Sequence, residues 1–274
     1  MQITLEEQPC ALQFVDDSLV VGTYALEEAD QTRRGSLLLL SPRLELLHRQ
    51  ACAGVLDVKV EGARVYVGLS SGCISVHDTC PQLLRLEEHR VSQAIVLCVQ
   101  PRGERVVAFS CSDGRVGILR DGAVVWEAQA HSLEAWTCGF DAHAALVSGG
   151  DDGLLCVDGA RLQRHDCGVT SILSAGEGVL LVGSYDGWLR AMQGRKVVEQ
   201  VRLPGGVWRL VPMPDGILAC CMQGGAALLS PNGHIRQLLT ATEVGELVYG
   251  GASRPGAYAV CSFYDRRLTL THHD

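Results

Sequence analysis

The chain has 274 residues, of which 47% are hydrophobic, enough to fill the core of one large domain. Its 31 acidic residues outnumber the 23 Lys and Arg, and the resulting formal net charge of −8 argues against a nucleic-acid-binding surface. No apolar run approaches the ~20 residues that a membrane-spanning helix needs, so we expect no membrane span.

Cysteine usage points to a reducing compartment. The twelve cysteines are scattered, contain no CxxC pair and follow no signal peptide. Buried thiols of this kind are typical of a protein that stays in the cytoplasm, where disulfides are rare. We therefore expect a cytoplasmic protein without structural disulfides.

One short phrase recurs six times along the chain. It consists of an apolar run, a polar turn that usually ends in Gly, and a second apolar run; it reads YVGLSSGCISV over Tyr66–Val76 and AVCSFYDRRLTL over Ala259–Leu270. Each copy is typical of a β-hairpin, because Gly supplies the positive φ that tight hairpin turns require. The turn glycines follow one another at 34 to 42 residues, the spacing of β-propeller blades: Gly72, Gly114, Gly153, Gly187 and Gly224.

Taken in chain order, the expected strands form a single all-β domain over residues 1–274. A lone strand over residues 2–8 precedes the first blade, which carries a polar insertion over residues 25–35, and the last blade ends without a fourth strand. Pairing the lone strand with that blade closes the ring. We predict a seven-bladed WD-repeat β-propeller, or a six-bladed one if the first blade is irregular. The blades span residues 10–50, 55–89, 94–129, 135–166, 169–203, 207–239 and 247–274.

Two histidines precede inner strands whose blades carry Asp in the hairpin turn. His131 would pair with Asp152 and His165 with Asp186, as such residues commonly do inside WD-repeat blades. The alternative is that one of these imidazoles, which titrate near neutrality, acts as a general base.

Two short motifs resemble catalytic elements and are better explained by the hairpins. Gly68–Gly72 matches the G-x-S-x-G nucleophile elbow, but it lies at a strand-to-strand turn rather than a strand-to-helix turn. The pair Asp151 and Asp152 is adjacent in sequence, so we expect Asp152 in the turn and Asp151 facing solvent at the blade rim. No spacing of His, Cys or carboxylates suggests a metal site, and no motif suggests a cofactor.

Aromatic and acidic residues gather at one rim of the expected ring. Five of the ten Trp and Tyr residues occupy positions that should point to the same end. Rings beside carboxylates suit a quaternary ammonium ligand, and they equally suit a protein-binding hot spot. The rim positions are Glu134, Trp136, Asp151, Thr170, Tyr185, Trp208, Arg209, Met222, Tyr249 and Tyr264.

The strings QAHSLEAWTCGF, LVSGGDDGLL, LVGSYDG, LPGGVWRL, ELVYGG and AVCSFYD occur in this order from Gln129 onward. This part of the chain resembles the WD-repeat proteins of diphthamide biosynthesis, the diphthine methyl ester hydrolases. The resemblance implies metal-independent hydrolysis of the methyl ester of methylated diphthine on translation elongation factor 2, giving diphthine and methanol. It implies a monomer, with no cofactor.

The resemblance also suggests roles for the rim. Because diphthine carries a trimethylammonium group, aromatic residues with Glu134 or Asp151 nearby would hold the cation. His165 or His131 would activate water, and Arg209 would donate hydrogen bonds to the oxyanion, or only to the carbonyl of the substrate. The rival hypothesis is a non-enzymatic WD-repeat scaffold that binds a peptide or protein at the same mouth. The expected aromatic ligands are Trp136, Tyr185, Trp208, Tyr249 and Tyr264.

Overall fold

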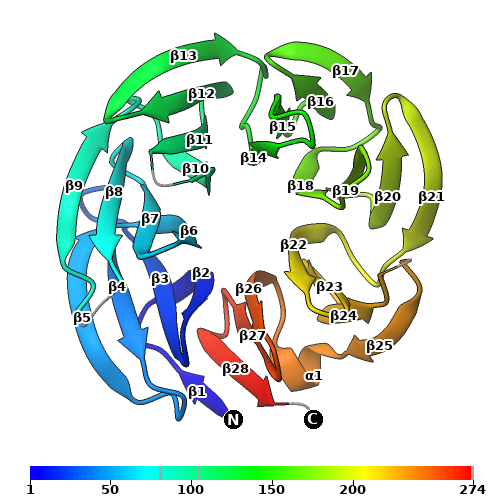
Figure 1. Ribbon diagram of the computed structural model, residues 1–274. Coiled ribbons are helices and arrows are strands. Elements are labelled where there is room, and N and C mark those ends of the chain that lie inside the picture. The colour runs from blue at the N-terminus through cyan, green and yellow to red at the C-terminus, as the bar shows by residue number, and fades with distance from the viewer. Residues whose placement is uncertain (80–81, 104, 232, 273–274) are drawn as a thin grey trace.

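The chain folds into a closed ring of antiparallel sheets (Figure 1). The computed structural model describes residues 1–79, 82–103, 105–231 and 233–272. Seven four-stranded sheets stand around a central axis like the blades of a propeller. The prediction of a seven-bladed all-β propeller is confirmed, and the six-bladed alternative is wrong.

Within each blade the first strand lies nearest the axis and the second pairs with it (Figure 1). The inner strands are β2 (Gln8–Val15), β6 (Val55–Glu61), β10 (Val96–Pro101), β14 (Thr137–Phe140), β18 (Val169–Ser174), β22 (Val207–Met213) and β26 (Val248–Arg254). The second strands are β3 (Ser18–Glu27), β7 (Arg64–Leu69), β11 (Val106–Cys111), β15 (Leu146–Gly149), β19 (Val179–Ser184), β23 (Gly216–Cys221) and β27 (Ala257–Ser262).

The third and fourth strands lead outward to the rim of the ring. The third strands are β4 (Thr32–Leu40), β8 (Cys73–Asp78), β12 (Arg115–Arg120), β16 (Leu154–Val157), β20 (Trp188–Gln193), β24 (Ala226–Leu229) and β28 (Arg267–His272). The outer strands are β5 (Leu46–Ala53), β9 (Arg85–Arg90), β13 (Ala123–Gln129), β17 (Ala160–Arg164), β21 (Lys196–Arg202), β25 (Ile235–Leu239) and, for the last blade, β1 (Gln2–Thr4).

The last blade is completed by the start of the chain, as predicted. Strand β1 pairs antiparallel with β28, Gln2 opposite Thr269 and Thr4 opposite Arg267. This strand is shorter than the expected 2–8 stretch because the chain enters β2 at Gln8. Closing the ring in this way leaves no unpaired sheet edge between the first and last blades.

The hydrophobic core lies between neighbouring blades rather than at the ring's centre. One cluster joins Val20 and Leu37 of the first blade to Val58 and Val67 of the second. The second strands are buried on both faces, while the outer strands are largely exposed. Close packing of the first two blades requires Gly22, where a Cβ would lie 2.2 Å from Cγ1 of Val55.

A recurring bulge shapes the end of the ring where the inner strands begin. In six inner strands the register shifts near the first residue and leaves one residue unpaired. Such a bulge redirects a side chain away from the sheet face. In the fourth blade Trp136 occupies the same place, directly before β14. The six bulged residues are Cys10, Leu56, Leu97, Thr170, Trp208 and Tyr249.

Two local features differ from the expectations. Most of the polar stretch 25–35 is strand, because β3 continues to Glu27 and β4 begins at Thr32. A short helix, α1 (Ala241–Val244), connects β25 to β26 and begins with a capping box between Thr240 and Glu243. No helix within the described residues is long and apolar enough to cross a membrane.

Candidate functional site

Aromatic rings from four blades meet at the mouth of the ring. The Trp208 ring, 8% exposed, lies at the centre. Its centroid is 5.2 Å from that of Trp136, 5.8 Å from that of Tyr185 and 4.8 Å from that of Tyr249. At these distances the rings pack against one another, so the cluster is closed rather than arranged around an open space.

The cluster continues to the surface through a ring that sequence reasoning missed. Phe263 lies 5.4 Å from Tyr249 and 5.4 Å from Tyr264, measured between centroids. Tyr264 is 73% exposed. All five aromatic residues expected at the rim thus join one aromatic cluster, which consists of Trp136, Tyr185, Trp208, Tyr249, Phe263 and Tyr264.

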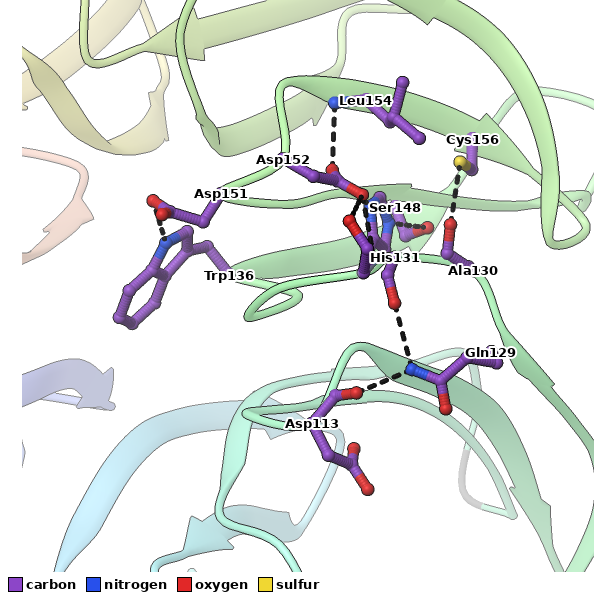
Figure 2. A network of polar contacts seen from close by, with 11 residues as sticks. Asp113, Gln129, Ala130, His131, Trp136, Ser148, Asp151, Asp152, Leu154 and Cys156 are labelled. Carbon is purple, nitrogen blue, oxygen red and sulfur yellow. Dashed lines mark hydrogen bonds and ion pairs between the residues drawn. The ribbon is translucent and has the colours of Figure 1, made fainter.

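A carboxylate is held against this cluster. Asp151 Oδ1 accepts a hydrogen bond of 3.1 Å from the Trp136 indole (Figure 2), and the Asp151 N–H donates to the Glu134 carbonyl at 2.8 Å. Burial raises the pKa of Tyr185, and the negative charges of Asp151 and Glu134, with a hydrogen bond to Asp151, raise it further. Asp151, which was expected to face solvent, is half-buried, and the indole and the Tyr185 hydroxyl engage its carboxylate.

Arg209 follows Trp208 in β22 and reaches across the axis. Its Nη2 lies 3.6 Å from Oδ1 of Asp57 in β6, on the other side of the ring (Figure 1), and the two side chains are 12% and 3% exposed. The Val99 N–H donates to Asp57 Oδ2 at 3.0 Å, and Lys59 Nζ lies 4.0 Å from Oδ1. Burial alone would lower the pKa of Arg209, but attraction to Asp57 raises it overall, so the guanidinium stays charged.

A small recess of about 10 Å³, room for a single water molecule, lies between the aromatic cluster and Arg209. Most of its lining comes from the bulged positions and from Trp136, which explains why one end of the ring collects these side chains. Leu97 is a lining residue that the rim pattern did not include, although its place at the start of an inner strand could have identified it. The lining residues are Leu97, Trp136, Thr170, Trp208, Arg209 and Tyr249.

His131 is fully engaged inside its blade. Its Nδ1 lies 3.1 Å from Asp152 Oδ1 and its Nε2 lies 2.9 Å from Ser148 Oγ (Figure 2), and the residue is 2% exposed. Burial alone would raise the pKa of Asp152, but hydrogen bonds from the Ser132 N–H, His131 and the Leu154 N–H lower it. The predicted pair of His131 and Asp152 is confirmed, and both ring nitrogens of His131 are occupied by this network.

The predicted pair of His165 and Asp186 is wrong. Asp186 instead accepts hydrogen bonds from Arg190 at 2.6 and 3.2 Å and from the Trp188 N–H at 2.9 Å. The Nε2 of His165 is buried without a hydrogen-bond partner among the described residues. Burial, and secondarily the positive charge of Arg190, lowers the pKa of His165, so the ring is held in its neutral form.

Eleven cysteines are described and each is free, while Cys80 lies outside the described residues. Across the described ranges no three His, Cys, Asp or Glu side chains are grouped as metal ligands would be. Gly68–Gly72, which matches the nucleophile-elbow pattern, joins the antiparallel strands β7 and β8 and lacks the strand-to-helix geometry of an elbow.

Comparison with known structures supports the architecture. A chain in the crystal structure of the mitotic checkpoint complex matches with a TM-score of 0.80 over 100% of this chain and 91% of that one. The two sequences are 15% identical, so this likeness shows the fold alone. It gives the scaffold hypothesis no additional support.

Comparison with known sequences identifies the family and corrects the expected reaction. No sequence model of a protein family matches the chain. Diphthine methyltransferase of Schizosaccharomyces pombe is 30% identical over 94% of this chain and 91% of the relative. That name states the transfer of a methyl group, so the expectation of a hydrolase, a methylesterase acting on methylated diphthine, is contradicted. The resemblance to WD-repeat proteins of diphthamide biosynthesis is confirmed, and the chain belongs to the diphthine methyltransferase family.

Proposed function

We propose that this chain is an enzyme of diphthamide biosynthesis that acts on diphthine carried by translation elongation factor 2. The observation that carries the proposal is the 30% identity with diphthine methyltransferase over 94% of the chain. The reaction proposed is the one in that name, addition of a methyl group to diphthine. The mouth of the ring is the proposed site.

The aromatic cluster supplies the recognition chemistry. A trimethylammonium group donates no hydrogen bonds, and aromatic faces attract it by about 0.5 to 2 kcal/mol per ring. Asp151, held by the Trp136 indole, adds a negative charge beside the rings. Since the Trp208 ring has neighbours at 4.8 to 5.8 Å, the cation enters when one ring of the cluster turns aside.

A methyl donor is a separate requirement of the proposed reaction. Donors of the S-adenosylmethionine type are nucleotide-sized, and ligand pockets for such molecules usually measure ~300 to 1,000 Å³. The recess of about 10 Å³ is far smaller than this. Its residues do not fit the substrate and a donor together, and only substrate binding is assigned to them.

The test measures by mass whether the protein substrate gains a methyl group. Elongation factor 2 carrying diphthine would be incubated with the purified chain and S-adenosylmethionine, and the mass of the peptide that carries diphthine would be measured by mass spectrometry. We expect the gain of one methyl group, abolished in Trp208→Ala because that ring is the centre of the cluster.

The matched control is Trp188→Ala, which removes a tryptophan outside the cluster; its ring packs under Arg202 at 5.7 Å. This variant should keep the full rate. No change in mass with folded wild-type protein, or the loss of a methyl group, contradicts the proposal. A gain that survives Trp208→Ala keeps the reaction and removes the cluster from it.

We propose further that the chain acts as a monomer in the cytoplasm. The eleven free cysteines support a reducing compartment. Cell fractionation beside elongation factor 2 tests the location, and light scattering tests the oligomeric state.

A further inference from the structure

A groove of about 360 Å³ lies between the fifth and sixth blades (Figure 1). Its walls are the second, third and outer strands of the fifth blade and the second strand of the sixth. The turn at 175–177, which follows an inner strand, and Pro231 and Gly233, which follow a third strand, complete the lining. These turns lie at the end of the ring opposite the aromatic cluster, because neighbouring strands of a blade run antiparallel. A ligand of the groove therefore leaves the mouth free.

The floor of the groove is apolar. Leu181, Leu189 and Ile217 line it and belong to the core cluster that joins the two blades. Val198 is left unpaired where the register of β21 shifts, and it is 48% exposed at the groove. The core cluster thus reaches the surface here, and an apolar side chain seated on it would remove apolar area from water.

The rim of the groove is negatively charged. Among the described residues its lining contains two carboxylates and no Lys, Arg or His. Glu177 comes from the turn, Glu199 comes from β21, and both are exposed. The Glu199 side chain reaches toward the sixth blade, since a Cβ on Gly233 would lie 3.9 Å from its Oε1.

The same junction between the second and third blades is smaller. The cavity there, between the corresponding strands, measures about 150 Å³. In its second and third strands Tyr66 lies opposite Val76, whereas Leu181 lies opposite Ala191 in the same register of the fifth blade. Both side chains of the fifth blade are smaller, which explains the wider groove.

The smaller junction also satisfies its own carboxylate. Glu87 in β9 lies 3.8 Å from Nη1 of Arg64 and 2.7 Å from Nε2 of His89. These partners come from the same blade, so the carboxylate needs no partner from outside.

The fifth blade keeps this carboxylate without its partners. Glu199 has the register of Glu87 in the outer strand. Val179 and Val201 occupy the positions that hold Arg and His in the second blade. Glu199 is therefore placed for an ion pair whose cation the lining of the groove does not supply, as far as the chain is described.

We propose that this groove binds a segment of a partner protein in which an aliphatic side chain lies next to Lys or Arg. The aliphatic side chain rests on Leu181 and Ile217, and the cation pairs with Glu199. The rim carboxylates and the net charge of −8 attract a cationic segment and repel an anionic lipid surface or a second copy of the chain. The inference does not depend on the proposed function, because the groove and the aromatic cluster lie at opposite ends of the ring.

The experiment titrates the full chain with three peptides and follows the methyl signals of Ile, Leu and Val by NMR. The probes are acetyl-Leu-Lys-Leu-Lys-amide, acetyl-Leu-Glu-Leu-Glu-amide and acetyl-Gly-Lys-Gly-Lys-amide. We expect the first to shift the signals of Val198 and Ile217. It should bind on the order of 10-fold more tightly than either of the others, because each of them lacks the cations or the apolar side chains.

The decisive variant is Val179→Arg, which gives Glu199 the internal partner that Glu87 has. It should weaken binding of the basic peptide by about 3-fold, the effect of one exposed ion pair. Glu199→Gln should have a similar effect and serves as the second variant if Val179→Arg unfolds the chain. The matched control is Glu87→Gln, which removes the corresponding carboxylate at the smaller junction and should leave the affinity unchanged.

Several outcomes would overturn the proposal. These are equal binding of the three peptides, shifts confined to other blades, no shift at all, or full affinity in folded Glu199→Gln. Broadening of the Ile217 signal when the chain alone is concentrated would assign the groove to a second copy. Broadening on addition of phosphatidylcholine vesicles would assign it to lipid. None of these results bears on the methyl transfer, which the mass measurement on elongation factor 2 decides separately.

Discussion

The fourth and fifth blades carry the same pair of residues and use them differently. In the fourth blade His131 bonds Asp152 at 3.1 Å and Ser148 at 2.9 Å. In the fifth blade the buried Nε2 of the corresponding His165 has no partner within the part of the chain that the structure describes, and Asp186 binds Arg190 instead. A histidine and an aspartate at matching positions therefore do not determine the network.

One position that differs is in the second strand. Ser148 lies opposite Cys156, and Val182 lies opposite Arg190 in the corresponding register of the fifth blade. Val182 cannot hydrogen-bond a ring nitrogen. Arg190 occupies the position of Cys156, and its guanidinium donates hydrogen bonds to Asp186.

The other position is at the end of the second strand. A Cβ on Gly150 would lie 2.5 Å from Nδ1 of His131, so the imidazole approaches only because glycine is there. The fifth blade has Ser184 at this place, and its hydroxyl donates to the Cys167 carbonyl at 3.4 Å. The comparison shows that the space beside the ring and the acceptor across from it decide where the histidine binds.

Removal of each histidine should give the largest difference between the blades. His131→Ala leaves a buried carboxylate short of a partner, and we expect the free energy of unfolding to fall by ~3 kcal/mol. His165→Ala breaks no side-chain hydrogen bond that the structure records and should cost ~1 kcal/mol. Urea unfolding of both variants measures the difference, and equal losses would contradict the comparison.

Placing the fifth blade's serine in the fourth should have the next largest effect. Gly150→Ser puts a Cβ against the His131 ring, and overpacking of this kind costs ~1 to 3 kcal/mol. The reciprocal Ser184→Gly should cost less than ~1 kcal/mol, the usual penalty of glycine in a strand. Thermal unfolding of the pair tests this, and a harmless Gly150→Ser would refute the role assigned to the glycine.

Giving the fifth blade the missing acceptor should stabilise it. Val182→Thr keeps the branched shape and places a hydroxyl where Ser148 stands in the fourth blade, so the free energy of unfolding should rise by up to ~1 kcal/mol. The gain should disappear when His165 is replaced by Phe. Destabilisation by Val182→Thr alone would mean that the His165 ring points elsewhere.

The smallest effect concerns pH. Because burial lowers the pKa of His165 in the folded chain, below pH ~6.5 the unfolded chain takes up a proton that the folded chain does not. Stability therefore falls as pH drops below this value and stops falling below the folded pKa. His165→Gln should remove less than ~1 kcal/mol of this loss between pH 6.5 and 5.5. An unchanged slope in chemical denaturation would contradict it.

Much of the fold could be predicted because hairpin turns and alternating apolar residues are local signals. The seven blades, the pairing of β1 with β28 and the gathering of aromatic residues at one rim all follow from such signals. The stretch 25–35 was misassigned because its residues are polar, although in β3 and β4 they pair with one another outside the core.

The site was harder to predict where it depends on contacts across the ring. Asp57 and Arg209 come from blades that meet only over the axis, and nothing in either local sequence signals the other. Asp151 was expected in solvent because its turn is local, whereas the Trp136 indole that binds it comes from the segment directly before β14. The reaction itself was wrongly inferred from the resemblance, since the relative's name states methyl transfer.

The joint between β1 and β28 has a consequence for how the chain is made. Strand β1 contributes Gln2–Thr4 and is synthesised before the inner strands of all seven blades, while β28, at Arg267–His272, is synthesised after them. Contacts between such distant segments form late, since loop closure opposes them. The ring can therefore close only after β28 has been synthesised. Until then the unpaired sheet edges are exposed, and chaperones can protect them. In the closed ring the two segments are joined by a ladder of only three residue pairs, so we expect early hydrogen exchange there.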